Sequence, residues 1–233
     1  MKTKSPLLLL SGLLCDDTVW QAIADQITDV ADVTMMSFQN HETIKAMAEQ
    51  VLTFAPKTFA LAGHSMGGRV ALEVYRQAPS RVERLALFNT GIHSKKENEL
   101  QGRQKLLSLA KDEGMMAVAK AWLPPMMSAT SLTDTALMNG LEAMVARYST
   151  ENFFKQIQAL LARPNAKNVL TTISVPTLLL SGSDDQWSPV AQHQAMQQKI
   201  KNSRMAIIEN AGHMAPAERP NEVSNVIRQW LME

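Results

Sequence analysis

The pentapeptide GHSMG at residues 63–67 places Ser65 between two glycines with G-x-S-x-G spacing. This spacing is typical of a serine that acts as a covalent nucleophile at a sharp turn from a strand into a helix. Such a turn brings neighbouring backbone close to the serine, and glycines relieve the crowding because they have no Cβ. Glycine and serine are common residues, however, so an idle serine in a glycine-rich turn would show the same pattern. The rest of the chain has to decide between these interpretations.

A serine hydroxyl is a poor nucleophile at neutral pH, so it needs a base within hydrogen-bond reach and usually a carboxylate that orients the base. The sequence offers these groups after two apolar runs. Asp184 and Asp185 follow one run, and His213 follows the next. The carboxyl ends of parallel strands share one edge of a sheet, and ligands bind at that edge. We therefore expect Ser65, one of the two aspartates and His213 to lie together.

Six short apolar runs predict the strands that would position these groups, and each has the composition of a strand buried on both faces. They lie at residues 7–10, 33–38, 59–62, 85–88, 177–180 and 205–208. Apolar residues recur at helical spacing between the runs, as after Ser65, until Pro79 stops that pattern. Alternating strands and helices predict an α/β fold class with a doubly wound, mainly parallel six-stranded sheet.

The alternation stops between residues 92 and 173, where the sequence becomes helical and rich in methionine. We therefore predict a core formed by residues 1–91 and 174–233, with a helical cap inserted at residues 92–173. Methionine-rich helices provide an adaptable apolar surface that accepts an acyl chain, although such residues also simply bind helices together. The candidates for lining the substrate pocket are Trp122, Met126 and Trp187.

Composition narrows the functional classes. The 233 residues are 45% hydrophobic, with a formal net charge of +1 and one cysteine. We expect one core and no nucleic-acid partner, because no basic run stands out. No stretch approaches the ~20 apolar residues that span a bilayer, so we expect a cytoplasmic protein without a membrane partner. No histidine and carboxylate cluster has metal-ligand spacing, and we expect no metal or cofactor.

The motifs together resemble those of the α/β-hydrolase superfamily, in particular its small cap-bearing esterase and C–C hydrolase branch. Residues 63–68, 182–189 and 212–220 are similar to the nucleophile elbow, the acid loop and the histidine loop of that branch. The resemblance covers essentially the whole chain, and the order serine, aspartate, histidine agrees with it. It implies that Asp185, three residues after a glycine, is the acid rather than Asp184.

The resemblance also implies a role for each residue. Ser65 attacks the substrate, His213 is the general base, and Asp185 orients His213. The backbone N–H groups of Met66 and Leu13 form the oxyanion hole.

The chain departs from the family pattern in two places. It has Ser-Gly-Leu-Leu at residues 11–14, where the family usually has His-Gly after the first strand. Two leading antiparallel strands common in the family have no room before Lys4, so we predict a sheet without them.

The resemblance implies a carboxylesterase that hydrolyses a small-molecule ester through an acyl-enzyme. Residues 95–169 contain ten basic and seven acidic residues, an excess that permits an acyl carrier protein to dock. The chain also resembles the pimeloyl-carrier methyl ester esterases. Two alternatives stay open: a C–C bond hydrolase or menaquinone-pathway lyase with the same triad, and a non-catalytic ligand receptor on this fold. The sequence does not define the oligomeric state.

Overall fold

Six parallel strands form the central sheet, in the order β2-β1-β3-β4-β5-β6. The computed structural model describes residues 4–233, so the first three residues of the predicted core segment lie outside the description. Each strand overlaps one predicted apolar run. The strands are β1 (Ser5–Leu10), β2 (Ala31–Met36), β3 (Phe59–His64), β4 (Val82–Phe88), β5 (Thr177–Gly182) and β6 (Ser203–Ile208).

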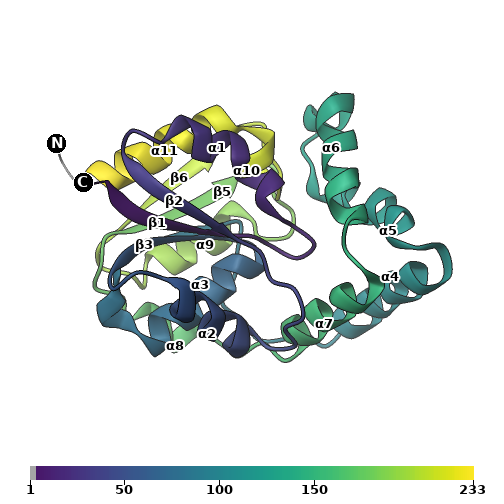
Figure 1. Ribbon diagram of the computed structural model, residues 1–233, viewed down its shortest axis with the longest axis horizontal. Coiled ribbons are helices and arrows are strands. Elements are labelled where there is room, and N and C mark those ends of the chain that lie inside the picture. Colours follow the sequence, from purple (N-terminus) through teal and green to yellow (C-terminus); the bar gives the residue numbers. More distant parts are fainter. Residues whose placement is uncertain (1–3) are drawn as a thin grey trace.

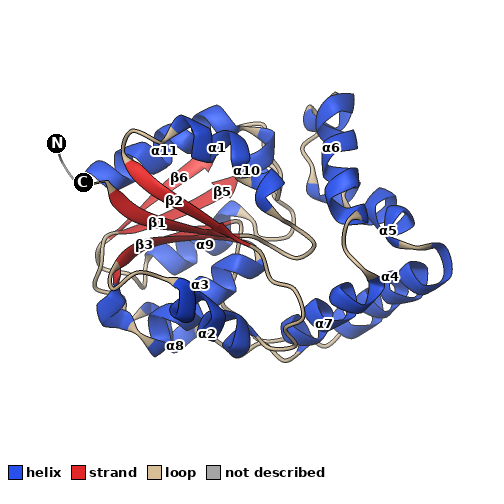
Figure 2. Cartoon of the chain, in the orientation of Figure 1, coloured by secondary structure: helices blue, strands red, loops and turns tan. Residues whose placement is uncertain are grey.

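Helices cover both faces of the sheet, as Figure 2 shows by colour. In Figure 1, α1 and α11 lie on one face, and α2 and α3 lie on the other. The predicted doubly wound sheet is therefore confirmed. The helical segments of the core are η1 (Asp17–Val19), α1 (Gln21–Gln26), α2 (Ile44–Phe54), α3 (Met66–Gln77), η2 (Pro79–Arg81), α9 (Val190–Gln197), α10 (Ala215–Glu218) and α11 (Pro220–Met232).

Burial differs between the inner and the outer strands. Every residue of β3 and β5 is buried, whereas most residues of β2 and β6 are exposed or only partly buried. The prediction of strands buried on both faces is thus wrong for β2 and β6. These are the edge strands, and each has only one neighbour in the sheet, which leaves one long side of the strand uncovered by another strand.

A helical insertion follows β4. It comprises α4 (Glu99–Glu113), α5 (Met115–Trp122), η3 (Pro124–Met126), η4 (Ser131–Thr133), α6 (Thr135–Ala146), α7 (Thr150–Leu161) and α8 (Lys167–Leu170). Figure 1 shows α4, α5, α6 and α7 together beyond one side of the sheet, whereas α8 lies beside α3. Within residues 4–233, no helix has the length and apolar character needed to cross a membrane.

The strand order determines where a ligand can bind. After β1 the chain continues to β2 toward one edge of the sheet, and after β3 it continues to β4 toward the other edge. The neighbours β1 and β3 therefore mark a switch in strand order. The loops that follow these two strands diverge there and leave a crevice at the carboxyl edge. The loop after β1 contains Leu13, and the turn after β3 contains Ser65.

Candidate active site

Ser65 occupies a tight turn between β3 and α3, with a positive φ of 54°. A non-glycine residue rarely adopts this conformation, and the turn persists because the surroundings hold it. The Ser65 N–H donates to the Phe88 carbonyl oxygen at 2.9 Å. A Cβ at Gly63 would overlap the backbone of Gly67, and a Cβ at Gly67 would overlap the carbonyl group of Leu10. Both glycines are therefore required by close backbone contacts that aim the serine at the crevice.

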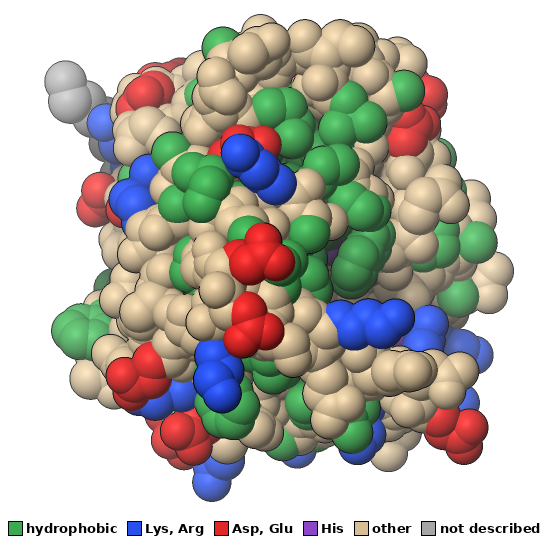
Figure 3. All heavy atoms as spheres, turned by 90° about the vertical axis from the view of Figure 1, so that its right-hand side faces the viewer, with side chains coloured by type: hydrophobic (Ala, Val, Ile, Leu, Met, Phe, Trp, Pro, Cys, Tyr) green, Lys and Arg blue, Asp and Glu red, His purple; other side chains and the backbone are tan. Residues whose placement is uncertain are grey.

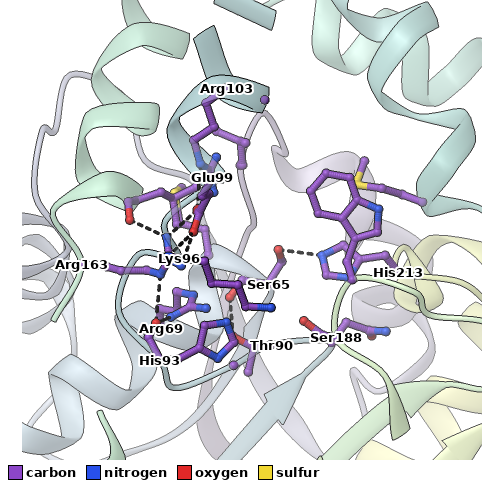
Figure 4. A pocket seen from close by; sticks show the side chains of 18 of the residues that line it. Ser65, Arg69, Thr90, His93, Lys96, Glu99, Arg103, Arg163, Ser188 and His213 are labelled. Carbon is purple, nitrogen blue, oxygen red and sulfur yellow. Dashed lines mark hydrogen bonds and ion pairs between the residues drawn. The ribbon is translucent and has the colours of Figure 1, made fainter. Parts of the chain in front are cut away.

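Ser65, His213 and Asp185 form a continuous hydrogen-bonded chain. His213 Nε2 lies 2.8 Å from Ser65 Oγ, and His213 Nδ1 lies 2.9 Å from Asp185 Oδ2. Figure 4 shows the bond between Ser65 and His213 across the pocket. The neighbouring Asp184 is exposed, and its carboxylate accepts from the hydroxyl of Ser183 instead. The structure thus brings Asp185 to the histidine and leaves Asp184 outside the site.

The Asp185 carboxylate is buried and held by several donors. Its Oδ1 accepts from the N–H groups of Trp187 and Ser188 at 2.8 and 2.9 Å, and its Oδ2 accepts from the Asn89 side chain at 2.9 Å. Burial opposes the negative charge, but His213 and these donors outweigh it and hold the pKa of Asp185 well below its usual value. Asp185 is therefore ionised at neutral pH and able to stabilise a protonated His213.

The two expected oxyanion donors lie at the same place. Leu13 and Met66 both line the cavity that contains Ser65. Met66 is the first residue of α3, where backbone N–H groups have no intrahelical partner. Within residues 4–233, neither the Leu13 nor the Met66 amide donates to a protein acceptor. A Cβ at Gly12 would lie 3.2 Å from Ser65 Cβ, so the loop that carries Leu13 packs directly against the serine.

A cavity of about 440 Å³ opens above Ser65. Trp122, Met126 and Trp187, the residues expected at the substrate pocket, all line it. Trp187 is half exposed, and its ring centroid lies 6.2 Å from that of His213. Among residues 4–233, no group of three or more His, Cys, Asp and Glu side chains is arranged to hold a metal ion.

The insertion contacts the histidine loop directly. The His213 N–H donates to the Met126 carbonyl oxygen at 2.6 Å. The buried Glu218 carboxylate accepts from the N–H groups of Ser128 and Gly212, both at 2.8 Å. One carboxylate therefore fastens the segment after η3 to the residue that precedes His213.

Sequence reasoning missed several polar residues of this site. Asn89 is one of them. It follows β4, and the sequence at the end of this strand was assessed only for a carboxylate. A group of charged side chains on another wall of the cavity is the second omission. Arg69 could have been found from its position four residues after Ser65, since residues at this spacing share a helix face. The other charged residues belong to the insertion: Lys96, Glu99, Arg103 and Arg163.

Comparison with known proteins decides the family. The sequence pattern of the alpha/beta hydrolase fold family matches residues 34–220. The chain belongs to the α/β-hydrolase fold family. The predicted superfamily is thus confirmed, and so is the predicted fold with its helical insertion.

Relatives within the α/β-hydrolase family differ in the bond they cleave. Human monoacylglycerol lipase ABHD6 is 24% identical over 98% of this chain and 75% of its own length. The 2-hydroxy-6-oxononadienedioate/2-hydroxy-6-oxononatrienedioate hydrolase of Paraburkholderia xenovorans is 27% identical over 72% of this chain, which spans only 60% of that relative. A thermophilic esterase from Thermogutta terrifontis has a TM-score of 0.88 at 26% identity, covering 99% of this chain and 90% of its own. These similarities support a hydrolase, with esterases and C–C hydrolases equally distant.

Proposed function

We propose that this α/β-hydrolase cleaves small-molecule carboxylic esters through an acyl-enzyme on Ser65. The observation that carries the proposal is the hydrogen-bonded chain from Ser65 Oγ through the His213 ring to Asp185, with distances of 2.8 and 2.9 Å. This arrangement supplies a nucleophile, a base and a group that orients the base. It opens into a cavity of about 440 Å³, a volume within the range of small-molecule sites.

The proposed reaction has two steps. His213 takes the proton from Ser65 as Oγ bonds to the ester carbonyl carbon, and the N–H groups of Leu13 and Met66 donate to the resulting oxyanion. The C–O bond to the alcohol then breaks, and the alcohol leaves with the proton from His213. A water molecule, deprotonated by His213, attacks the acyl carbon of the acyl-enzyme. The bond from this carbon to Ser65 Oγ breaks, His213 returns the proton to Oγ, and the carboxylic acid leaves. Asp185 keeps His213 in the correct tautomer in both steps.

The similar proteins do not support an ester that is attached to an acyl carrier protein. Three of the basic residues that gave the insertion its positive excess, Lys96, Arg103 and Arg163, line the cavity instead. Their charge acts on a bound small molecule. We therefore confine the proposal to small-molecule substrates.

C–C bond hydrolysis is the second candidate, favoured by the 27% identity to the Paraburkholderia hydrolase. The same three side chains would serve, with a carbon leaving group in place of an alcohol. Parallel assays on p-nitrophenyl esters and on vinylogous 1,5-diketones separate the two activities. A kcat/KM higher for the diketone by tenfold or more would replace the first proposal with the second.

The decisive test compares the wild type with Ser65→Ala on p-nitrophenyl esters of short and medium acyl chains. We expect Ser65→Ala to lower kcat by about 10⁴-fold or more, since removal of the nucleophile leaves only binding and oxyanion stabilisation. A fluorophosphonate probe should label the wild type at Ser65 alone. Ser80→Ala, which alters an exposed serine of η2, is the matched control and should behave as the wild type. Equal rates for the wild type and Ser65→Ala, or an unlabelled Ser65, would contradict the proposal.

A further inference from the structure

One wall of the cavity has an unusual charge balance. Four cationic side chains, Arg69, Lys96, Arg103 and Arg163, line it together with a single carboxylate, Glu99. We call these four cationic residues the cationic wall. In Figure 4 the wall lies on the side of Ser65 opposite His213. On the face shown in Figure 3, Lys and Arg side chains gather beside a hollow in which a histidine is visible.

Two of the arginines pair with Glu99, the only carboxylate among the described residues that line the cavity. Arg163 donates from Nη1 and Nη2 to the two oxygens of Glu99, each at 2.6 Å. Arg103 donates from Nε and Nη2 to one of these oxygens, at 2.9 and 2.6 Å. Burial opposes the charge of Glu99, but these bonds outweigh it and lower the pKa of Glu99 to about 2. Glu99 is therefore a full negative charge bonded to two arginines, and its attraction for Arg69 is smaller than the effects of burial and of the Arg163 charge on Arg69.

Arg69 and Lys96 are left with unused donors. The Arg69 side chain donates one hydrogen bond, from Nη1 to the carbonyl oxygen of His93 at 2.8 Å. Among the residues that the structure describes, its Nε and Nη2 groups have no acceptor, and the Lys96 ammonium has neither a hydrogen bond nor an ion pair. Arg69 is partly buried, whereas Lys96 lies at the exposed rim. Because the Arg69 side chain lines the cavity, a group with unused N–H donors is present there.

An incompletely paired cation at a half-buried site is costly, because little water replaces the missing counter-charge. Burial, together with the positive charge of Arg163, lowers the pKa of Arg69 to about 9. Arg69 is still protonated at neutral pH, so its charge remains to be balanced by something that enters the cavity. A planar carboxylate fits a guanidinium fork with two parallel hydrogen bonds.

The position of the wall indicates which part of the substrate carries the carboxylate. The leaving alcohol takes its proton from His213, so the alcohol part of an ester lies toward His213. The acyl part then points to the opposite side of Ser65, toward the cationic wall. Arg69 lies one helical turn beyond Ser65 on α3, with its backbone N–H 3.4 Å from the Ser65 carbonyl oxygen, and its side chain lines the same cavity as Ser65.

We propose that the cationic wall is an acyl-side carboxylate subsite, and that the substrate is a half-ester of a small dicarboxylic acid. This inference rests on the proposed serine hydrolase activity and specifies its substrate class. Arg69 binds the carboxylate, Lys96 adds charge at the rim, and Arg103, Arg163 and Glu99 hold the loop that carries Lys96 against the cavity. The subsite serves equally if the bond cleaved is C–C, because it recognises the acyl chain and not the leaving group.

The test uses two substrates of matched acyl length. In the p-nitrophenyl half-ester of glutaric acid a carboxylate occupies the place of the terminal methyl of p-nitrophenyl pentanoate. Rates are corrected with Ser65→Ala, which reports spontaneous hydrolysis. We expect the wild type to prefer the half-ester by about tenfold or more in kcat/KM, since a hydrogen bond between charged groups contributes more than a neutral contact. Equal or faster cleavage of the pentanoate would overturn the inference while leaving the esterase proposal intact.

Variants then assign the preference to residues. Arg69→Gln should lower the ratio of half-ester to pentanoate kcat/KM by about 10- to 100-fold, and Lys96→Gln by about 2- to 5-fold. Lys95→Gln is the matched control for Lys96→Gln, because Lys95 is exposed and does not line the cavity. Both Arg69 and Arg163 donate to the His93 carbonyl oxygen, so loop support is the competing explanation. Equal losses on both substrates in Arg69→Gln, with an unchanged ratio in Lys96→Gln, would establish loop support alone and overturn the subsite.

A binding measurement separates the subsite from the chemistry. Calorimetric titration of Ser65→Ala with glutarate should show binding that Arg69→Gln, in the same Ser65→Ala background, weakens about tenfold or more. Stronger competition by inorganic phosphate than by glutarate would overturn the assignment to a carboxylate. If neither ester is cleaved by the wild type but glutarate binds in this Arg69-dependent manner, the subsite stands and the esterase proposal fails. Absence of glutarate binding overturns the subsite whatever the esterase result.

Discussion

The side-chain amide of Asn89 donates a hydrogen bond to Oδ2 of Asp185 at 2.9 Å, and the same oxygen lies 2.9 Å from Nδ1 of His213. Asn89 directly follows β4 and has a positive φ of 48°, a conformation that asparagine tolerates better than most residues. Its Nδ2 also lies 3.2 Å from the Gly212 carbonyl oxygen. A single amide thus ties the acid loop and the histidine loop to the end of an inner strand.

Loss of this amide should weaken catalysis. Asn89→Leu removes the donor to Asp185, and kcat should fall about 10-fold or more, because a hydrogen bond to a charged group contributes about 1.5–3 kcal/mol. The measurement is kcat on p-nitrophenyl esters, with urea denaturation to count folded protein. Asn210→Leu is the matched control, since Asn210 is exposed and has a similar φ of 55° but does not contact Asp185. A similar loss of kcat in both variants would attribute the effect to backbone strain and contradict the prediction.

The contact between Glu218 and the histidine loop predicts a coupled loss of stability and rate. Glu218→Ala leaves the buried N–H groups of Ser128 and Gly212 without an acceptor, which should cost about 2–5 kcal/mol in the free energy of unfolding. Because Gly212 precedes His213, kcat should fall as well. Glu218→Gln keeps one acceptor and should be intermediate in urea denaturation. Glu222→Ala, at an exposed position of α11, should change the unfolding free energy by less than about 1 kcal/mol. An unfolding free energy of Glu218→Ala close to that of Glu222→Ala would contradict this role.

The meeting of Ser65, Asp185 and His213 was predictable because each follows a strand whose apolar residues mark it as buried. Parallel strands bring their carboxyl ends to one edge of the sheet. The prediction that residues 65, 185 and 213 lie together therefore does not depend on the conformation of the loops. The choice of Asp185 over Asp184 came from the family resemblance. It has a physical reason in the structure, where the buried side of the loop after β5 offers donors to Asp185 alone.

The cationic wall was not predictable as a unit. Arg163 lies after α7 and Glu99 begins α4, so they are 64 residues apart and meet only through the packing of the insertion. The spacing of apolar residues predicts which face of each helix in the insertion is buried, but not how the helices cross. The sequence therefore shows that the insertion has an excess of basic residues, but not which of these residues line the cavity. For this reason the excess suggested a docking site for an acyl carrier protein.

Gly67 and Gly140 lie in different surroundings, so replacement of each by alanine should have opposite effects on stability. A Cβ at Gly67 would overlap the Leu10 carbonyl group and approach the Ser11 carbonyl oxygen to 2.8 Å. Gly67→Ala should therefore push α3 away from the end of β1, at a cost of about 1–3 kcal/mol and with at least a tenfold loss of kcat. Gly140 lies exposed inside α6, where a Cβ meets nothing within 4 Å. Gly140→Ala should stabilise by about 0.5–1 kcal/mol with unchanged kcat. Thermal unfolding and ester hydrolysis check both, and a stable, active Gly67→Ala would refute the close-contact argument.

His64 should make the fold sensitive to acid. Its ring is buried, and its Nε2–H donates to the His213 carbonyl oxygen at 2.8 Å. Burial, with a contribution from His213, lowers the pKa of His64 to about 3, whereas an unfolded histidine has a pKa near 6.5. Between these values the unfolded chain binds the proton and the folded chain does not, so the unfolding free energy falls as pH decreases below about 6.5.

The contribution of this one residue can reach about 1.4 kcal/mol per pH unit, and His193, whose pKa burial also lowers, acts in the same direction. His64→Gln retains a donor but cannot take up the proton. Its unfolding free energy, measured in urea from pH 8 to pH 4.5, should start below that of the wild type because the packing is imperfect. The two curves should then converge as pH falls, since only the wild type loses the contribution of His64. Parallel curves would show that His64 is protonated in the folded state as readily as in the unfolded chain.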